Sequence, residues 1–252
     1  MALRPYIVGN WKMNGTRAAL AEARGIDRIA QRHPGVEVAM APPATLLQAM
    51  AHEATHSVIG AQNCHQESGG AFTGEISAPM LADAGARFVI VGHSERRWQH
   101  NESDSLVRAK AEAVLAARMG VIVCVGESEE KRQAGLAEAT VTAQLKASLP
   151  LVADAAAHLS VGYEPVWAIG TGRVPTVQDV GEMHRAIRAV LVEVYGEAGR
   201  GVRILYGGSV TSENAAQLLA ADEVCGALVG GASLTAERFA GIIMAAAALV
   251  EA

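Results

Sequence analysis

Short apolar runs alternate with longer amphipathic stretches along all 252 residues of the chain. The short runs have the length and the aliphatic character of strands buried on both faces, and the longer stretches have the helical period. The predicted strands cover residues 6–11, 36–41, 58–62, 88–92, 121–125, 159–163, 203–206 and 227–229. The predicted helices cover residues 18–31, 45–51, 79–84, 106–119, 137–149, 177–195, 213–219 and 236–247.

The regular alternation of strand and helix predicts one α/β domain that spans residues 1–252. The spacing of roughly 30 residues is that of a βα unit, and units of this kind build parallel sheets. Eight units without a Pro- or Ser-rich linker fit a closed (β/α)8 barrel, the TIM-barrel architecture. A doubly wound open sheet is the alternative that the alternation alone leaves open.

The amino-acid composition and net charge limit the classes of binding partner. Hydrophobic residues make up 50% of the chain and aromatic residues only 4%, so the core must be mostly aliphatic. A formal net charge of -5 argues against nucleic acid or an anionic membrane surface as partner, because both require a basic face. An anionic ligand would therefore need a site that is locally positive.

The cysteines and the two ends of the chain favour a cytoplasmic protein. Cys64, Cys124 and Cys225 are an odd number without zinc-ligand spacing, which is typical of reduced thiols. The first strand begins within about six residues, and no signal-peptide pattern precedes it. The longest apolar run, residues 239–250, is too short for a membrane span and is expected to be a packed helix.

Polar residues gather where the predicted strands end. The carboxyl ends of barrel strands carry the chemistry in this architecture, so these residues are candidates for one site. They are Asn10 and Lys12 after the first strand, Gln62 and Asn63 after the third, His93 and Glu95 after the fourth, Glu127 after the fifth, Glu164 after the sixth, Ser209 after the seventh, and Gly230 and Gly231 after the eighth.

Residues 162–172 carry the most specific local pattern. Glu164 directly follows an apolar strand, a stiff Pro-Val-Trp segment comes next, and Gly170 and Gly172 end the run. An acid at a buried edge beside a loop with stiff and flexible ends is what a general base under a closing lid requires. An ordinary strand-to-helix turn with a solvated glutamate is the alternative.

Five strings in this order resemble the triosephosphate isomerase family. They are GNWKMN at residues 9–14, GHSERR at 92–97, YEPVWAIGTG at 163–172, YGGSV at 206–210 and LVGGASL at 228–234. Each string is weak alone, but together they cover the chain from the first strand to the last. The resemblance implies an isomerase that interconverts dihydroxyacetone phosphate and D-glyceraldehyde 3-phosphate without a metal or an organic cofactor, in glycolysis or gluconeogenesis.

The same resemblance implies individual roles. Glu164 corresponds to the base, His93 to the electrophile, Lys12 to the fixed cation and Asn10 to its neighbour. Glu95 is implied to orient Lys12. The phosphate-holding positions correspond to Asn10, Lys12, Gly170, Ser209, Gly230 and Gly231, and the lid to Ala168, Ile169, Gly170, Thr171 and Gly172, with Ile169 and Leu228 covering the base.

Physical chemistry agrees with these roles. Moving a proton between adjacent carbons passes through an enediolate, which needs a base and a stabiliser of the oxyanion. Burial is expected to raise the pKa of Glu164 and make it a stronger base. The segment after His93 is expected to start a helix, whose N-terminus favours a neutral imidazole that donates an N–H to the substrate. Structural or packing roles remain the alternative for each residue taken singly.

The long connection from residue 63 to residue 79 predicts a docked or disordered loop. The resemblance implies that Thr73 in this loop supports Asn10 and His93 of a second copy, hence a homodimer. One position departs from the family pattern. Cys225 stands where an acidic residue is usual, so Arg188 is expected to lack a salt-bridge partner.

Two other classes of function remain open. A Schiff-base aldolase on the same barrel would use Lys12 as its nucleophile, although a nearby Glu95 should keep that lysine charged. A non-enzymatic protein that binds phosphorylated metabolites would leave the set of base and electrophile unexplained.

Overall fold

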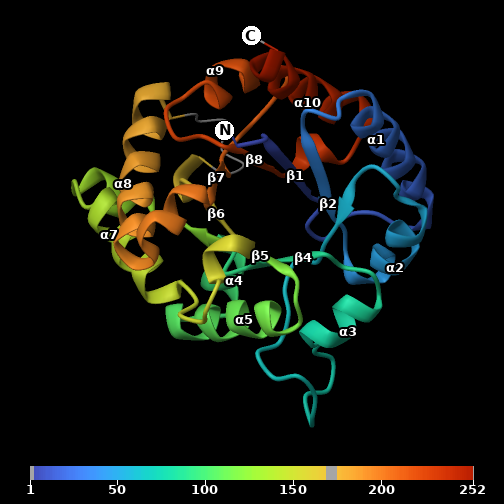
Figure 1. Ribbon diagram of the computed structural model, residues 1–252, viewed down its shortest axis with the longest axis horizontal. Helices are drawn as coiled ribbons and strands as arrows, with labels where there is room; N and C mark the ends of the chain where they lie inside the picture. The colour runs from blue at the N-terminus through green and yellow to red at the C-terminus, as the bar shows by residue number, and fades with distance from the viewer. Residues whose placement is uncertain (1–2, 169–174, 252) are drawn as a thin grey trace.

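The computed structural model describes residues 3–168 and 175–251, in which eight parallel strands form a ring and helices surround it (Figure 1). The strands are β1 (Tyr6–Asn10), β2 (Glu37–Ala41), β3 (Val58–Ile59), β4 (Phe88–Val91), β5 (Gly120–Val125), β6 (Leu159–Tyr163), β7 (Arg203–Tyr206) and β8 (Gly226–Val229). The α-helices of the described residues are α1 (Leu20–Arg32), α2 (Ala44–Glu53), α3 (Ala78–Asp83), α4 (Ser94–Gln99), α5 (Asp104–Ala116), α6 (Glu129–Gln133), α7 (Ala137–Ser148), α8 (Val177–Tyr195), α9 (Ala215–Leu219) and α10 (Ala236–Glu251).

The sheet closes on itself. Its hydrogen-bonded order is β3-β2-β1-β8-β7-β6-β5-β4, so β1 and β8 from the two ends of the chain are neighbours. The two outer strands meet through a parallel bridge between Ala61 and Val89. There the amide of Ala61 donates to the carbonyl of Phe88, and the amide of Ile90 donates to the carbonyl of Ala61, both at 2.9 Å. The predicted (β/α)8 barrel is confirmed, and the open-sheet alternative is excluded.

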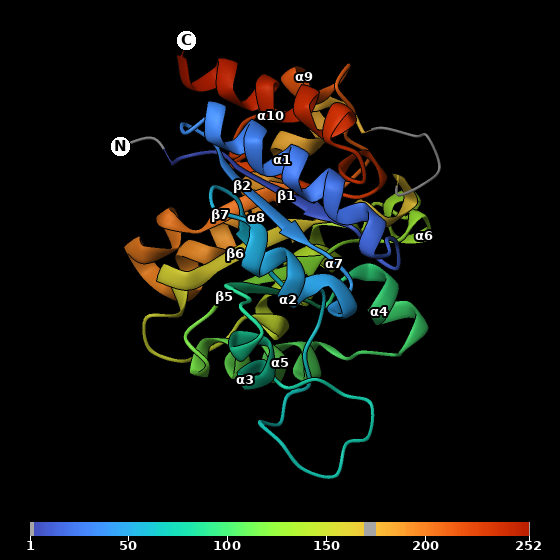
Figure 2. The same ribbon diagram turned by 90° about the vertical axis from the view of Figure 1, so that its right-hand side faces the viewer.

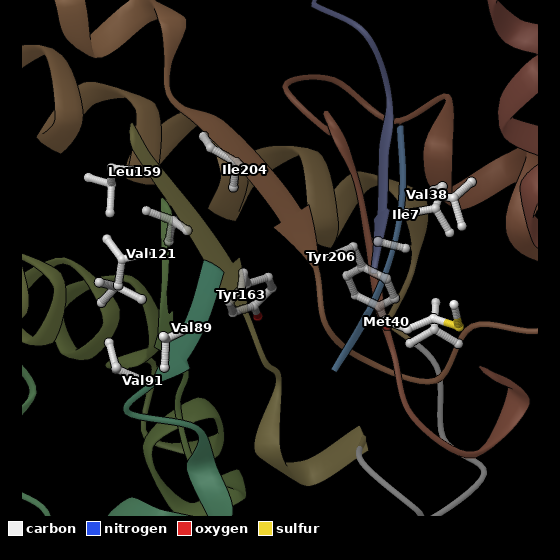
Figure 3. Close-up of a cluster of buried hydrophobic side chains, with 14 of the residues drawn as sticks. Ile7, Val38, Met40, Val89, Val91, Val121, Leu159, Tyr163, Ile204 and Tyr206 are labelled. Atoms are coloured by element: carbon white, nitrogen blue, oxygen red, sulfur yellow. The ribbon is translucent and has the colours of Figure 1, made fainter. Parts of the chain in front are cut away.

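The period of two along each strand divides the core into an inner and an outer layer. On β4, Phe88 and Ile90 belong to the small inner cluster, whereas Val89 and Val91 belong to the large outer cluster that packs under the helices. Both layers are apolar, which is why the strands have continuous hydrophobic sequences. Figure 3 shows outer-layer side chains along the strands, among them Ile7, Val38, Met40, Val121 and Ile204.

Helix α6 was not among the predicted helices, and α4 was expected only as a helix start after His93. Neither contains a buried residue, so neither carries the apolar stripe on which the prediction depended. Side chains cap both starts: the amide of Glu95 donates to Nδ1 of His93, and the amide of Lys131 donates to Oγ of Ser128. The third strand is shorter than predicted, since its ladder with β2 spans only two residue pairs.

All eight strands run in one direction, so their carboxyl ends meet at one end of the barrel, near α4 and α6 (Figure 2). The connection between β3 and α3 projects away from the barrel body. No helix within residues 3–168 and 175–251 is long and apolar enough to cross a membrane.

Candidate active site

A pocket of about 350 Å³ lies at the carboxyl ends of the strands. Seven of the predicted site residues line it together, although up to 221 positions separate them in the sequence (231 − 10 = 221). They are Asn10, Lys12, His93, Glu164, Ser209, Gly230 and Gly231. Leu228, predicted to cover the acid, also lines the pocket.

Glu164 is fixed by its backbone at the end of β6. Its amide donates to the carbonyl of Val125 at 2.8 Å. Two glycines make room for it: a Cβ on Gly126 would lie 1.8 Å from the carbonyl oxygen of Glu164, and one on Gly207 would lie 2.9 Å from its Cγ. Any side chain at Gly126 would therefore displace the acid.

The carboxylate of Glu164 is only 2% exposed, and both of its oxygens are occupied. Oε1 lies 2.8 Å from Nε2 of His93, and Oε2 accepts the backbone N–H of Ser94 at 2.9 Å. Burial raises the pKa of Glu164, but His93 and the Ser94 amide outweigh burial, and the net pKa lies below its usual value. The expectation of a raised pKa is therefore wrong for this arrangement, because the hydrogen bonds stabilise the charged form.

His93 begins α4 as its N-cap residue and is 6% exposed. Its Nδ1 accepts the backbone N–H of Glu95 at 3.2 Å. A nitrogen that accepts a hydrogen bond carries no proton, so this contact favours a neutral ring with its N–H on Nε2, which faces Glu164. Burial lowers the pKa of His93, but the Glu164 carboxylate outweighs burial, so the net pKa is raised while the two remain in contact.

Lys12 is held by Asn10 of its own segment and by contacts from two other segments. Its Nζ lies 2.5 Å from Oε1 of Glu95, and its amide donates to Oδ1 of Asn10 at 3.0 Å. Nε2 of Gln62 donates to its carbonyl oxygen at 2.9 Å. Its backbone has φ = 52°, which is costly for a residue with a side chain. These contacts fix both the backbone and the cationic end of Lys12.

Backbone groups and small residues form the other end of the pocket. Gly231 begins a 3₁₀ turn (Gly231–Ser233) after β8, where Oγ of Ser233 donates to the carbonyl of Gly230 at 2.7 Å. Oγ of Ser209 donates to the carbonyl of Ala168 at 2.9 Å, which ties the loop after β7 to the start of the predicted lid. The other lid residues, Ile169, Gly170, Thr171 and Gly172, lie outside the described residues.

The segment that leads to the lid is anchored on a buried acid. Nε1 of Trp167 donates to Oε1 of Glu127 at 2.8 Å, and the hydroxyl of Tyr163 donates to the same oxygen at 3.2 Å. The amide of Val166 donates to the carbonyl of Glu127 at 3.1 Å. Sequence reasoning placed Glu127 at a strand end but gave it no partner.

Thr73 is exposed on the projecting loop and lies outside this pocket.

The expectation that Arg188 lacks a salt-bridge partner is wrong. Its Nε lies 2.8 Å from Oε2 of Glu223, two positions before Cys225. The sequence analysis also missed Asn14 and Arg238, which line the pocket. Asn14 ends the string GNWKMN, which could have pointed to it, whereas no quoted string contains Arg238.

Fold and site together define the class of the protein, a (β/α)8-barrel enzyme with a polar pocket at the carboxyl ends of its strands. The sequence model of the family described as triosephosphate isomerase matches residues 5–246. The chain belongs to the triosephosphate isomerase family and is an isomerase.

Similar proteins agree over nearly the full length. The triosephosphate isomerase of Caulobacter vibrioides is 54% identical over 245 residues, which cover 96% of each chain. That of Dinoroseobacter shibae is 55% identical and covers 96% of this chain and 98% of the relative. The crystal structure of triosephosphate isomerase from Bartonella henselae superposes with a TM-score of 0.90 at 42% identity, covering 96% of this chain and 99% of that one.

Proposed function

We propose that the chain interconverts dihydroxyacetone phosphate and D-glyceraldehyde 3-phosphate by proton transfer, with Glu164 as base, His93 as electrophile and Lys12 as electrostatic stabiliser. The observation that carries the proposal is the convergence of Glu164, His93 and Lys12 on one pocket in a member of this family. The proposal uses no organic cofactor or metal, because Glu164, His93 and Lys12 supply the base, the hydrogen-bond donor and the positive charge that the proton transfer needs.

The reaction conserves every atom. The Glu164 carboxylate removes a proton from the carbon next to the carbonyl, and the electron pair of that C–H bond moves toward the carbonyl oxygen. His93 donates a hydrogen bond to this oxygen, and the charge of Lys12 stabilises the resulting enediolate. Through Nε2 of His93, the former carbonyl oxygen gains a proton and the hydroxyl oxygen on the neighbouring carbon loses one. The protonated Glu164 then gives its proton to the former carbonyl carbon, which completes the isomerisation.

The contact between Glu164 and His93 is the resting arrangement of the acid. Its loss would change the pKa of Glu164, because His93 and Ser94 are the groups that lower it against the effect of burial. A substrate oxygen that takes the Nε2–H of His93 removes the His93 contribution, so the effect of burial weighs more and Glu164 becomes a stronger base. Substrate binding thus activates the base.

The phosphate is held at the other end of the pocket by Ser209, Gly230 and Gly231, together with Gly170. Small residues let backbone N–H groups approach an anion closely. Lys12, with Asn10 beside it, faces both ends of the ligand, and Glu95 orients it through the contact at 2.5 Å. Residues Ala168, Ile169, Gly170, Thr171 and Gly172 serve as a lid that excludes water, with Ile169 and Leu228 over the base.

The decisive experiment is a coupled assay with each triose phosphate in deuterated water. The proposal expects turnover in both directions and deuterium at the carbon next to the carbonyl. Borohydride trapping with substrate tests the aldolase alternative, which requires covalent labelling of Lys12. Binding without hydrogen exchange would favour the non-enzymatic alternative.

We further propose a homodimer in which Thr73 of one copy supports the site of the other. A groove of about 360 Å³ adjoins the active-site pocket and is where we expect the projecting loop of the partner to dock. Asn10, Lys12, His93 and Glu95 line this groove, so a partner loop would contact the residues that hold the lysine. Sedimentation of the wild type and of Thr73→Arg tests the assembly, and undiminished dimerisation and activity in the variant would exclude this role.

We also propose that the chain forms a single domain and that the protein is cytoplasmic. The pairing of β1 with β8 makes both ends of the chain part of one ring, which supports one folding unit. Cys64, Cys124 and Cys225 are unpaired thiols, as in proteins of a reducing compartment.

A further inference from the structure

A second cavity lies at the amino ends of the strands, opposite the active site. Its volume is about 510 Å³, within the range of small-molecule sites. Tyr6 and Arg203 open β1 and β7, and Ser160 is the second residue of β6. All three line the cavity, whereas Glu164 lies beyond the other end of β6.

Small residues line part of the cavity. Gly120 and Gly201 both line it. A Cβ on Gly201 would meet no atom within 4 Å, and one on Gly120 would meet only ordinary contacts, the nearest at 3.6 Å. Space for a ligand therefore remains beside these glycines and Ser160.

Two hydroxyl groups on the wall of the cavity have no hydrogen-bond partner within the described parts of the chain. Tyr6 is 4% exposed and Ser160 is 5% exposed. Neither hydroxyl oxygen is sealed from the cavity, so each can bond to a water or a ligand there. Burial raises the pKa of Tyr6, so its hydroxyl keeps its proton and remains a donor. The wall thus presents donors to the cavity.

The charge around the cavity is positive in a chain whose net charge is -5. Arg4, Arg87 and Arg203 line it against one carboxylate, Glu37. Glu37 is paired with Arg203 at 2.6 Å, and the Arg203 guanidinium also lies 4.1 Å from the centre of the Tyr6 ring.

The other two arginines, Arg4 and Arg87, lie at the rim of the cavity. Arg4 donates only to the carbonyl of Val36, at 2.8 Å. The exposed side chain of Arg87 makes no hydrogen bond or ion pair with any other described residue. Two guanidinium groups without carboxylate partners, above a wall of hydroxyl donors, match an anion that carries several oxygens.

We propose that this cavity, at the amino ends of the strands, is a second binding site for a small polyanion with phosphate or carboxylate groups. Arg4 and Arg87 bind its charge at the rim, and the hydroxyls of Tyr6 and Ser160 donate to it inside. The site is separate from the reaction proposed above and does not depend on it.

The test is a titration of the isotope-labelled full-length protein with pyrophosphate and, separately, with citrate, followed by amide NMR. Saturable shifts are expected at Tyr6, Ser160 and Arg203 with at least one of the two anions. Preference for pyrophosphate identifies a phosphate ligand, and preference for citrate a carboxylate ligand. Shifts at residues 208–211 and 230–233 in the same spectra report the active site separately, so failure of either proposal is visible without the other.

Variants test which side chains contribute to anion binding in the cavity. Arg4→Gln with Arg87→Gln should weaken anion binding here at least about tenfold, because two charge-assisted contacts are lost. The matched control changes two exposed arginines of α1, Arg28→Gln with Arg32→Gln, and should leave affinity unchanged. Tyr6→Phe with Ser160→Ala, which removes only two oxygens, should also weaken binding. Triose phosphate turnover should stay at the wild-type value in all three double variants.

Two results would overturn the proposal. One is the absence of saturable shifts at the amino-end cavity with both anions. The other is equal affinity in the rim variant and the α1 control, which would reduce the binding to general attraction by surface arginines. Circular dichroism of each variant establishes that it is folded before affinities are compared.

Discussion

The side-chain amide of Gln62 donates to the carbonyl oxygen of Lys12 at 2.9 Å and to that of Ala41 at 2.8 Å. Both N–H groups of the amide are thus used, and both acceptors belong to the backbone at the ends of neighbouring strands. Lys12 sits at φ = 52°, a conformation that its surroundings must maintain. Gln62 therefore positions Lys12, the proposed electrostatic stabiliser, without lining the active-site pocket itself.

Gln62→Glu should reduce kcat/KM about tenfold or more, because a carboxylate cannot donate to the two carbonyls and repels them. The matched control is Gln31→Glu on the exposed side of α1, which should change activity less than about twofold. Steady-state kinetics on both variants measure the difference. Equal activities would show that the backbone of Lys12 holds its conformation without Gln62.

Glu164→Asp should lower kcat far more than it changes KM. Shortening the side chain by one methylene withdraws the base from the substrate, and a misplacement of about one ångström can cost on the order of 10²-fold in rate. The backbone contacts that fix residue 164 are unaffected, so substrate affinity should persist. Wild-type turnover in this variant would remove Glu164 from the mechanism.

Lys12→Met should cost at least about 3 kcal/mol of transition-state stabilisation, the effect of losing one oxyanion donor. The substitution also leaves Glu95 without the partner that it contacts at 2.5 Å, which adds an unbalanced negative charge beside the pocket. Lys131→Met, an exposed lysine of α6, is the control for the loss of one positive charge. An increase in KM alone would reduce Lys12 to a residue that attracts substrate.

His184 should make the stability of the protein depend on pH between about 6.5 and 4. The residue is fully buried, and burial lowers its pKa to about 4. In that interval the unfolded chain binds the proton and the folded chain does not, so stability rises with pH. The shift from the ordinary value of 6.5 corresponds to roughly 3 kcal/mol, present above pH 6.5 and lost on acidification toward pH 4.

Urea unfolding of the wild type and of His184→Gln over this range measures the effect. The variant should lose most of the slope, since glutamine does not titrate. The lowered pKa values of Asp27 and Glu102 also make stability rise with pH, but only at pH values below the ordinary carboxyl pKa. The raised pKa of His93 makes stability fall as pH rises. The same slope in both proteins would assign the acid sensitivity to other groups.

Periodicity predicted the elements that bury apolar surface and missed those that do not. The strand Leu159–Tyr163 and the helix Val177–Tyr195 were predicted with the bounds that the structure has, because each is defined by a run or stripe of apolar residues. The helix Glu129–Gln133 buries nothing and was missed. The order of strand and helix limited the architecture to two candidates, and only the bridge between Ala61 and Val89 decided between them.

Sequence alone determined the fold class, the family and the set of polar residues that could meet at one end of the barrel, because strand order and strand ends follow from local pattern. Tertiary structure decided which groups actually touch. The pKa of Glu164 depends on His93 and Ser94, about 70 positions away, and Arg188 takes Glu223 as its partner despite the cysteine at 225. Distances between side chains set hydrogen bonds and pKa values, and the chain fixes those distances only when the barrel closes.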